Sequence, residues 1–264
     1  MSNLDPLFER VGLGLDTSGD VCSIAISRGR TLLSEYRFTH RMHLSERMLD
    51  DLVRLLESCD LTLKEVDYFA VGIGPGSFTG TRVAVTTVKM LADTLQKPVY
   101  GVNSLGAIAS DYFGVASVVA PLTLCRKRDV YFALYHAAEK AIQVLESENE
   151  FQTQVSPQII SLDELPTLLQ TAGISDILFT GDAQALLTPE DRTALGANNV
   201  LFRIAKRSVS LASQALSLAQ TRILRGDRGD DPVLLTPLYL ALPPISQPKI
   251  PYVTLPNAQQ SGAD

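Results

Sequence analysis

A glycine-rich loop, Gly74–Gly80 (GPGSFTG), constrains the fold of this 264-residue chain more than any other segment. It follows an aliphatic run at 67–73 and precedes a segment, 78–96, whose apolar residues recur with a helical period. A buried strand, a tight glycine turn and a helix in that order are typical of α/β folds, in which helices cover a sheet. Another apolar run at 98–102 predicts the next strand.

The segment before this loop is expected to supply the rest of the same sheet. Three apolar runs at 11–16, 21–27 and 31–38 are joined by tight polar turns, which predicts an antiparallel meander. Leu44–Glu57 then changes to a helical period, and its apolar residues cover about half of the helix circumference. Packing on one layer needs a stripe of only about 100°. The wide apolar face therefore predicts contacts on more than one side.

The second half of the chain shows a similar alternation of predicted strands and helices but contains fewer motifs. Apolar patterns predict strands at 116–124, 130–137, 177–180 and 200–204, with a further strand-like segment at 141–146, and helices at 165–170 and 208–224. The two halves therefore resemble an approximate repeat of one mixed-sheet unit. Seven of the 14 prolines lie in the last 33 residues, so we expect an extended surface arm followed by a disordered end.

Composition excludes several classes of protein. The net charge of −6 argues against a chain that grips a nucleic-acid backbone by itself, because such binding requires a basic surface. The three cysteines form no CxxC pair, which excludes a disulfide framework and favours a reducing cytoplasm. Neither a signal peptide nor an apolar run of membrane-spanning length is evident, so we expect a soluble cytoplasmic protein without membrane contact.

Two loops carry the candidate binding chemistry. Gly74–Gly80 could offer backbone N–H groups at a helix N-terminus to a phosphate, or it could be a tight turn with Ser77 as the helix cap. It lacks the lysine of a Walker A loop and the spacing of a nucleophile elbow. Asp16, at the end of the first strand, could hold hydrated Mg²⁺ or serve ordinary turn chemistry. The candidate nucleotide- or phosphate-binding residues are Asp16, Thr17, Ser18, Gly74, Gly76, Ser77 and Thr79.

Other polar clusters have weaker chemical signals. His40 and His43 are spaced as metal ligands could be, but a metal site would need a third ligand, and a solvated loop is the alternative. We therefore predict no metal site. The basic run at 126–128 is too short for an independent nucleic-acid patch. It is either a solvated turn or a small part of a composite tRNA surface.

Several stretches together resemble the TsaB (YeaZ) family. They are LGLDTS at 13–18, HLSER at 43–47, VGIGPGSFTGTR at 71–82, KMLA at 89–92 and PVYGVNSL at 98–105. The resemblance covers residues 11–110 strongly and the remainder thinly. It implies an α/β fold of two tandem ribonuclease-H-like lobes, as in the actin/sugar-kinase/Hsp70 (ASKHA) superfamily. The expected division is a lobe at 1–106 completed by helix 208–226, a smaller lobe at 107–207, and an arm at 227–264.

The same resemblance implies a non-catalytic role in tRNA modification. TsaB proteins assist a TsaD-type subunit that transfers threonylcarbamoyl to the tRNA adenosine next to the anticodon, and a TsaE-type ATPase joins them. We therefore expect a scaffold that reaches tRNA indirectly and binds no cofactor tightly, with ATP or ADP at the interface of the complex. TsaD-like proteins carry two metal-binding histidines where this chain has Ser104 and Ile108. The alternatives are a small-molecule kinase or phosphatase of the same superfamily and, with less support, a metallopeptidase.

The wide apolar face of Leu44–Glu57 suggests a surface for that partner. Val83 and Met90 lie off the main apolar stripe of the following helix. We therefore expect a four-helix bundle with the TsaD-type subunit, or with a second copy of this chain. Simple packing of the two helices on each other is the alternative. The candidate interface residues are His43, Leu44, Arg47, Met48, Val83, Thr87 and Met90.

Two positions depart from the family pattern. Leu124 stands where many members have an aspartate, and Ala241 stands where a C-terminal Pro-x-Tyr-x-Arg motif has its arginine. The contacts that those groups make in relatives are therefore in doubt here. The role of residues 232–264, which extend beyond the usual family length, stays open.

Overall fold

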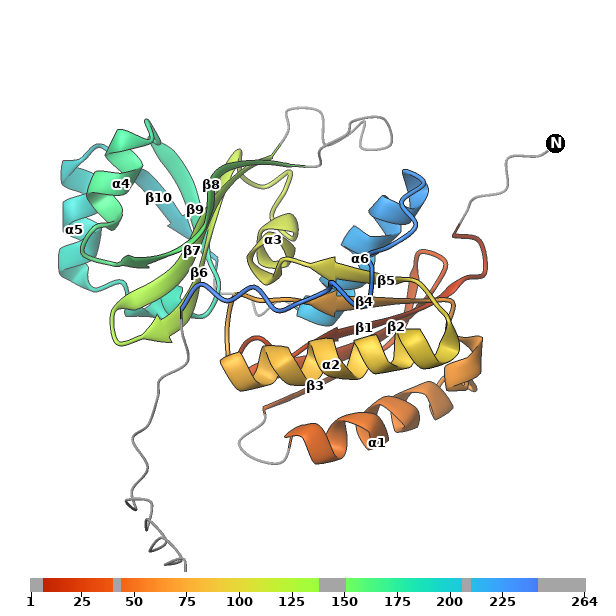
Figure 1. Cartoon of the computed structure of the whole chain (residues 1–264). Coiled ribbons are helices and arrows are strands. Elements are labelled where there is room, and N and C mark those ends of the chain that lie inside the picture. Colours follow the sequence, from red (N-terminus) through yellow and green to blue (C-terminus); the bar gives the residue numbers. More distant parts are fainter. Residues whose placement is uncertain (1–6, 40–43, 138–150, 206–209, 242–264) are drawn as a thin grey trace, which may run out of the picture.

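The computed structural model describes residues 7–39, 44–137, 151–205 and 210–241 (Figure 1). Two mixed β-sheets, each accompanied by helices, confirm the expected α/β class. The first sheet has the strand order β3-β2-β1-β4-β5. Its strands are β1 Val11–Asp16, β2 Val21–Arg28, β3 Thr31–Thr39, β4 Tyr68–Gly72 and β5 Val99–Val102.

The second sheet has the strand order β10-β9-β6-β7-β8. Its strands are β6 Val118–Arg126, β7 Asp129–Ala137, β8 Phe151–Ser161, β9 Asp176–Thr180 and β10 Leu201–Ile204. In each sheet the first three strands in sequence pair antiparallel and the last two join in parallel. The two sheets therefore share one topology, with β6 in the place of β1 and β9 in the place of β4.

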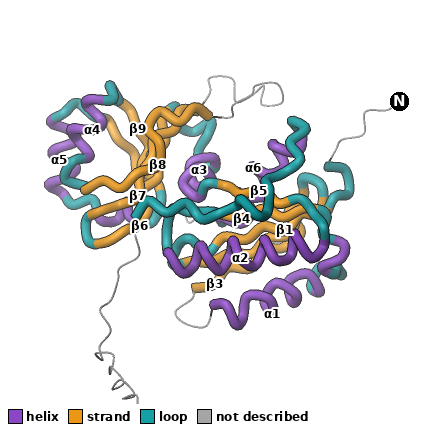
Figure 2. Tube along the Cα trace, viewed as in Figure 1, coloured by secondary structure: helices purple, strands orange, loops and turns teal. Residues whose placement is uncertain are grey.

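Helices cover both faces of the first sheet (Figure 2). The α-helices are α1 Leu44–Glu57, α2 Phe78–Leu95, α3 Ser104–Ser110, α4 Leu165–Thr171, α5 Pro189–Ala197 and α6 Leu211–Leu224, and the short 3₁₀ turns are η1 Leu63–Glu65 and η3 Ala183–Leu186. Helices α1 and α2 lie on one face and α6 on the other, while α3 lies between the two sheets (Figure 1). Helices α4 and α5 pack on the outer face of the second sheet.

Small residues explain how α6 reaches the first sheet. Ala212, Ala215 and Ala219 are buried against it, and a side chain on Gly14 of β1 would collide with the backbone of Ala212. Because both faces of β1 are covered, all six of its residues are buried. A helix from the end of the chain thus completes the core around a strand from its beginning.

Most sequence-predicted elements match the structure within two residues. The strand-like segment 141–146 lies outside the described residues, and the strand that pairs with β7 is β8. Helix α6 is described from Leu211, because 206–209 lie outside the described residues. The pattern missed α3, whose first six residues are all buried, because uniform burial leaves no apolar periodicity to detect.

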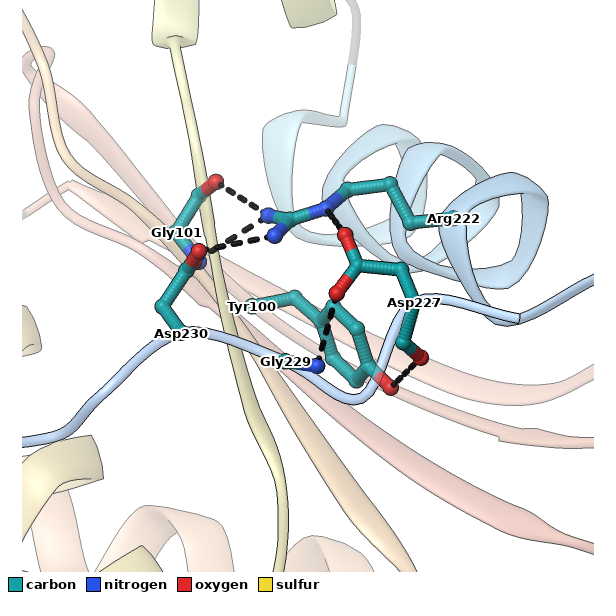
Figure 3. A network of polar contacts seen from close by, with 6 residues as sticks. All are labelled: Tyr100, Gly101, Arg222, Asp227, Gly229 and Asp230. Atoms are coloured by element: carbon teal, nitrogen blue, oxygen red, sulfur yellow. Dashed lines mark hydrogen bonds and ion pairs between the residues drawn. The ribbon is translucent and has the colours of Figure 1, made fainter. Parts of the chain in front are cut away.

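Residues 227–241, here called the strap, follow α6 and run along the edge strand β5. A polar network centred on Arg222 of α6 fixes the start of the strap (Figure 3). The Arg222 guanidinium donates to carboxylate oxygens of Asp227 and Asp230 at 2.7 Å each, and the Tyr100 hydroxyl donates to the Asp227 carbonyl at 3.0 Å. Asp230 also accepts from the Gly101 N–H at 2.6 Å. These contacts hold the strap against β5.

The strap continues along α2 on the side away from α1 (Figure 1). The Lys89 ammonium of α2 donates to the carbonyls of Val233 at 3.2 Å and Leu235 at 2.9 Å. The Leu235 side chain is buried in the core beneath α2, so the arm is anchored and does not merely rest on the surface.

Candidate functional site

A cleft of about 570 Å³ separates the loops of the two sheets. Both sheets contribute loops that follow or join equivalent strands, which is a common location for ligand sites in α/β proteins. The lining residues are Ser18, Gly19, Asp20, Val21, Pro75, Gly76, Ser77, Ser104, Ile108, Thr123, Leu124, Cys125, Gly181, Asp182, Gln184 and Leu211. Of the seven candidate binding residues, Ser18, Gly76 and Ser77 line this cleft.

Asp16 lies behind the cleft wall and is fully buried. One of its carboxylate oxygens accepts from the Ser18 N–H at 2.8 Å and from the Ser18 hydroxyl at 2.7 Å, and the other accepts from the Ser104 hydroxyl at 2.8 Å. Burial raises the pKa of Asp16, and these hydrogen bonds oppose the rise. In this conformation the Asp16 carboxylate points into the protein and not into the cleft, and a role in holding Mg²⁺ or phosphate stays a prediction.

The glycines of the Gly74–Gly80 loop are required by close packing on the first hairpin. A side chain on Gly76 would collide with the carbonyl of Ser18, and one on Gly80 would collide with the carbonyl of Thr17. Two hydrogen bonds hold the loops together, from the Ser77 N–H to the Ser18 carbonyl and from the Thr17 hydroxyl to the Gly80 carbonyl, both 2.6 Å. Thr17 thus lies beneath the cleft and holds the two loops in contact.

Ser104 of α3 joins the same polar cluster. Besides donating to Asp16, its hydroxyl accepts from the Gly74 N–H at 3.1 Å, and its own N–H donates to the Gly74 carbonyl at 2.8 Å. Ser77 caps α2 by accepting from the Gly80 N–H at 3.2 Å. Three N–H groups of the loop, those of Gly74, Ser77 and Gly80, are thus engaged with protein acceptors.

The charged side chains that line the cleft are acidic. Its lining residues include two carboxylates, Asp20 and Asp182, and no lysine, arginine or histidine. A polyphosphate is held by cationic side chains, by N–H groups, or through Mg²⁺ on carboxylates, and of these the lining lacks the cationic side chains. The buried hydroxyls of Thr123 and Thr180 have no hydrogen-bond partner among the described residues, and they suit water or a neutral polar group.

The second-sheet side of the cleft was largely missed from the sequence. Gly181 has a φ of 92°, and a side chain there would collide with the Leu122 carbonyl. The next residue, Asp182, accepts from the Leu124 N–H at 3.0 Å. Because β9 takes the place of β4, this turn is the counterpart of the Gly74 loop, so the internal repeat was the signal that could have located it.

A second, smaller hollow of about 340 Å³ lies on the outer side of α2. We call it the α2 groove, and its lining residues are Ser45, Phe78, Thr79, Arg82, Val83, Thr86 and Thr87. Thr79, predicted as a phosphate contact, therefore faces a different part of the surface from Ser18 and Gly76. Met90, one turn beyond Thr86, is 49% exposed.

The predicted interface residues separate into two groups. Val83 and Thr87 line the α2 groove and Met90 is exposed beyond it, whereas Leu44 and Met48 of α1 are buried in the core of the first sheet. Their apolar side chains contact the interior because α1 packs on both α2 and the sheet. Arg47 is exposed, 3.7 Å from the Asp51 carboxylate, and His43 lies outside the described residues.

The remaining polar candidates are accounted for by local contacts. Arg128 pairs with Asp163 and Asp191 at 2.7 Å each, and Arg126 pairs with Asp129 at 3.1 Å. The solvated-turn interpretation of this basic run thus fits the structure better than a tRNA contact.

The described ranges contain no group of three His, Cys, Asp or Glu residues arranged to hold a metal ion. His40 and His43 lie outside them. No helix in the described part of the chain is long and apolar enough to cross a membrane.

Comparison with known proteins agrees with the resemblance seen in the motifs. Residues 37–219 match the family model for TsaD, tRNA N6-adenosine threonylcarbamoyltransferase. The protein TsaB of Bacillus subtilis, described as a tRNA threonylcarbamoyladenosine biosynthesis protein, is 33% identical over 123 residues, which are 47% of this chain and 54% of that protein. TsaB of Escherichia coli is 29% identical over 151 residues, which are 56% of this chain and 63% of that protein.

The chain belongs to the TsaB (YeaZ) family. A crystal structure from Pseudomonas aeruginosa, described as an uncharacterized protein with similarity to peptidase YeaZ, matches with a TM-score of 0.67 and 26% identity. It covers 88% of this chain and all of the other. The alignments to the curated TsaB relatives span between half and two thirds of their length. The glycine loop that introduces α2 lies within the stretch that the family model matches.

Proposed function

We propose that this TsaB-family chain is a non-catalytic scaffold in the biosynthesis of tRNA threonylcarbamoyladenosine. In this proposal it pairs with a TsaD-type subunit, activates threonylcarbamoyl transfer to the adenosine next to the anticodon, and helps to recruit a TsaE-type ATPase. The observation that carries the proposal is the outer face of α2, where Met90 is exposed and Val83 lines a groove. Such apolar side chains on a helix surface favour a protein partner.

The cluster around Ser104 supports the non-catalytic assignment. Ser104 and Ile108 occupy positions where TsaD-like proteins are expected to carry metal-binding histidines. The Ser104 hydroxyl is engaged with Asp16 and Gly74, and the hydrocarbon side chain of Ile108 has no atom that can ligate a metal. This chain would therefore depend on its partner for the metal and for the transfer step.

The acidic cleft indicates which subunit of the complex would hold the nucleotide. Because the lining carries Asp20 and Asp182 and no cationic side chain, we propose that ATP or ADP at the subunit interface is held mainly by partner residues. We also propose that the tRNA is held mainly by the partner, because a chain with a net charge of −6 would contact it only indirectly. In the absence of a partner, the α2 face would pair two copies of this chain.

The shared topology of the two sheets supports the two-lobe ASKHA architecture. We propose that they are the two ribonuclease-H-like lobes of that superfamily, with boundaries near 106 and 207. Helix α6 packs on the first sheet, and this contact favours assigning 208–226 to the first lobe. Limited proteolysis tests the boundaries, because cleavage should concentrate between the proposed lobes.

Reconstitution of the modification reaction tests the proposed function. The assay combines a TsaD-type subunit, a TsaE-type ATPase, the adenylate-forming enzyme and tRNA, with and without this chain. We expect modified adenosine only when the chain is present. Full modification without it would refute the scaffold role, and ATP turnover by the isolated chain would favour the kinase or phosphatase alternative.

Charge substitutions on α2 test the partner surface separately. Met90→Asp should abolish co-purification with the TsaD-type subunit, because a charge would be buried at the interface without a partner. Val115→Asp provides a matched control, since Val115 is 63% exposed in the loop between α3 and β6. Equal co-purification of the Met90→Asp variant and the unmodified chain would exclude the α2 face as the interface.

A further inference from the structure

The strap brings the end of the described chain to the rim of the α2 groove. The ring of Tyr239 packs on the ring of Phe78, with centroids 4.7 Å apart and planes inclined by 32°. Phe78 opens α2 and lines the groove. Ala241, the last described residue, lies two positions after Tyr239. Residues 242–264 therefore begin close to the groove.

This starting point is fixed by several independent contacts. Arg222 holds Asp227 and Asp230 at the beginning of the strap (Figure 3). Farther along, the Leu238 N–H donates to the Ile73 carbonyl at 2.7 Å, directly before the glycine loop. A peptide tethered to a fixed point beside a site has an effective concentration in the millimolar range, so even weak contacts would keep it bound.

The groove combines an aromatic wall with hydrogen-bond donors. Phe78 and Val83 supply apolar surface, and the Arg82 guanidinium lies 5.6 Å from the centre of the Phe78 ring. The hydroxyl groups of one serine and three threonines also line it. Such a surface matches a polypeptide whose prolines pack on aromatic rings and whose carbonyl groups need donors.

The segment that begins at this rim has the corresponding composition. Residues 242–256 contain five prolines, together with leucine, isoleucine, valine and tyrosine, and their one ionisable cation is Lys249. Proline lacks a backbone N–H, and extended proline-rich chains have no internal hydrogen bonds, so their carbonyls are available to external donors. Fifteen residues in this conformation span about 46 Å, whereas α2 from Phe78 to Met90 spans about 18 Å.

We propose that residues 242–256 bind along the α2 groove of the same chain. The bound segment covers Val83 and Thr87 and reaches the neighbourhood of Met90, so it competes with whatever protein docks there. This competition rests on the proposed function, whereas the binding of the segment does not. Partner association then requires displacement of the chain's own C-terminal segment.

A single tryptophan tests the binding of the segment. The chain contains no tryptophan, so Ile245→Trp in the full chain introduces a unique fluorophore, at about six residues from Tyr239, which is the length of α2 from Phe78 to Met90. Docking in the groove should shift its emission to shorter wavelength than that of tryptophan in water. Adding Thr86→Arg, which places a bulky cation in the groove at an exposed position, should abolish the shift.

Matched variants separate this effect from damage to the fold. Thr167→Arg changes an exposed threonine on α4, which packs on the second sheet and lies far from the α2 groove. This variant should leave the shift in tryptophan emission intact. Val83→Asp, checked for native circular dichroism, should act like Thr86→Arg. A solvent-like emission in the Ile245→Trp chain, or a shifted emission that both groove variants leave unchanged, would overturn the proposal.

Addition of the TsaD-type subunit tests the competition. We expect the Ile245→Trp emission to move to the solvent-like value as the complex forms. If the complex forms without changing the emission, the segment does not compete. If no complex forms while the groove variants still change the emission of the free chain, the proposed function fails and the binding of the segment stands.

Discussion

Ser104→Ala should destabilise the protein strongly for a substitution that removes one oxygen atom. Ser104 is 1% exposed, and its hydroxyl donates to Asp16 at 2.8 Å while accepting from the Gly74 N–H at 3.1 Å. Alanine leaves a buried carboxylate oxygen with one partner fewer and a loop N–H without its acceptor. Because Asp16 is fully buried, a water molecule could replace the lost contact only by entering from the cleft that Ser104 lines.

The size of the effect follows from the two hydrogen bonds. A hydrogen bond to a charged group contributes about 1.5–3 kcal/mol, and one between neutral groups about 1 kcal/mol. We therefore expect Ser104→Ala to lower the free energy of unfolding by about 3 kcal/mol. Ser213→Ala is the control, because the Ser213 hydroxyl donates only to a neutral carbonyl, that of Ser210 at 3.1 Å, and its loss should cost about 1 kcal/mol or less.

Urea unfolding at neutral pH, followed by circular dichroism, measures both variants. A double-mutant cycle with Asp16→Asn identifies the cause, because Ser104→Ala should cost only about 1 kcal/mol once the carboxylate is absent. If Ser104→Ala costs no more than Ser213→Ala, or costs the same with and without the carboxylate, the buried cluster does not stabilise the junction of the two loops.

Three further predictions concern the same lobe. Burial raises the pKa of Asp16 above 3.8, so the native state keeps the Asp16 proton to higher pH than the unfolded chain does. The free energy of unfolding, compared with that of Asp16→Asn, should therefore fall as the pH rises from below 3.8 through the raised pKa. A difference between the two proteins that stays constant with pH in urea titrations would contradict this. Gly80→Ala should destabilise by about 1–3 kcal/mol because its methyl group meets the Thr17 carbonyl, whereas Gly196→Ala on α5, which has open space, should stabilise by up to about 1 kcal/mol. Burial and neighbouring carboxylates raise the pKa of Cys22 to about 12, so a thiol reagent at pH 8 should modify the other two cysteines first and Cys22 only on unfolding.

Local patterns were sufficient for most elements with one solvent-facing side, although α5 was missed. The bounds of α1 were predicted correctly because its polar and apolar residues alternate with the helical period. Two other elements lacked that contrast. Helix α3 is buried almost throughout, and β8 carries Pro157 and several polar residues, which weaken a strand pattern although proline is tolerated on an edge strand.

The sequence located the two loops of the site but not the direction of their side chains. It placed Asp16 and the Gly74–Gly80 loop each after a strand, and the structure shows that these strands, β1 and β4, are neighbours. It could not reveal that the hydroxyl of Ser104, 88 residues from Asp16, donates a hydrogen bond to the Asp16 carboxylate. The capping box at the start of α5, formed by Thr188 and Asp191 around a proline, was a local signal from which this helix could have been predicted.

The placement of α6 has a consequence for folding during synthesis. The Ala212 N–H donates to the hydroxyl of Ser23, a residue made 189 positions earlier, and α6 covers the face of the first sheet that Ala25 and Tyr68 line. Until the ribosome has made α6, that apolar face has no cover, although all five strands of its sheet already exist. At about 5–20 residues per second this interval lasts several seconds or longer. The nascent first sheet should therefore be a chaperone substrate, whereas the second sheet and its helices, all encoded before α6, can pack earlier.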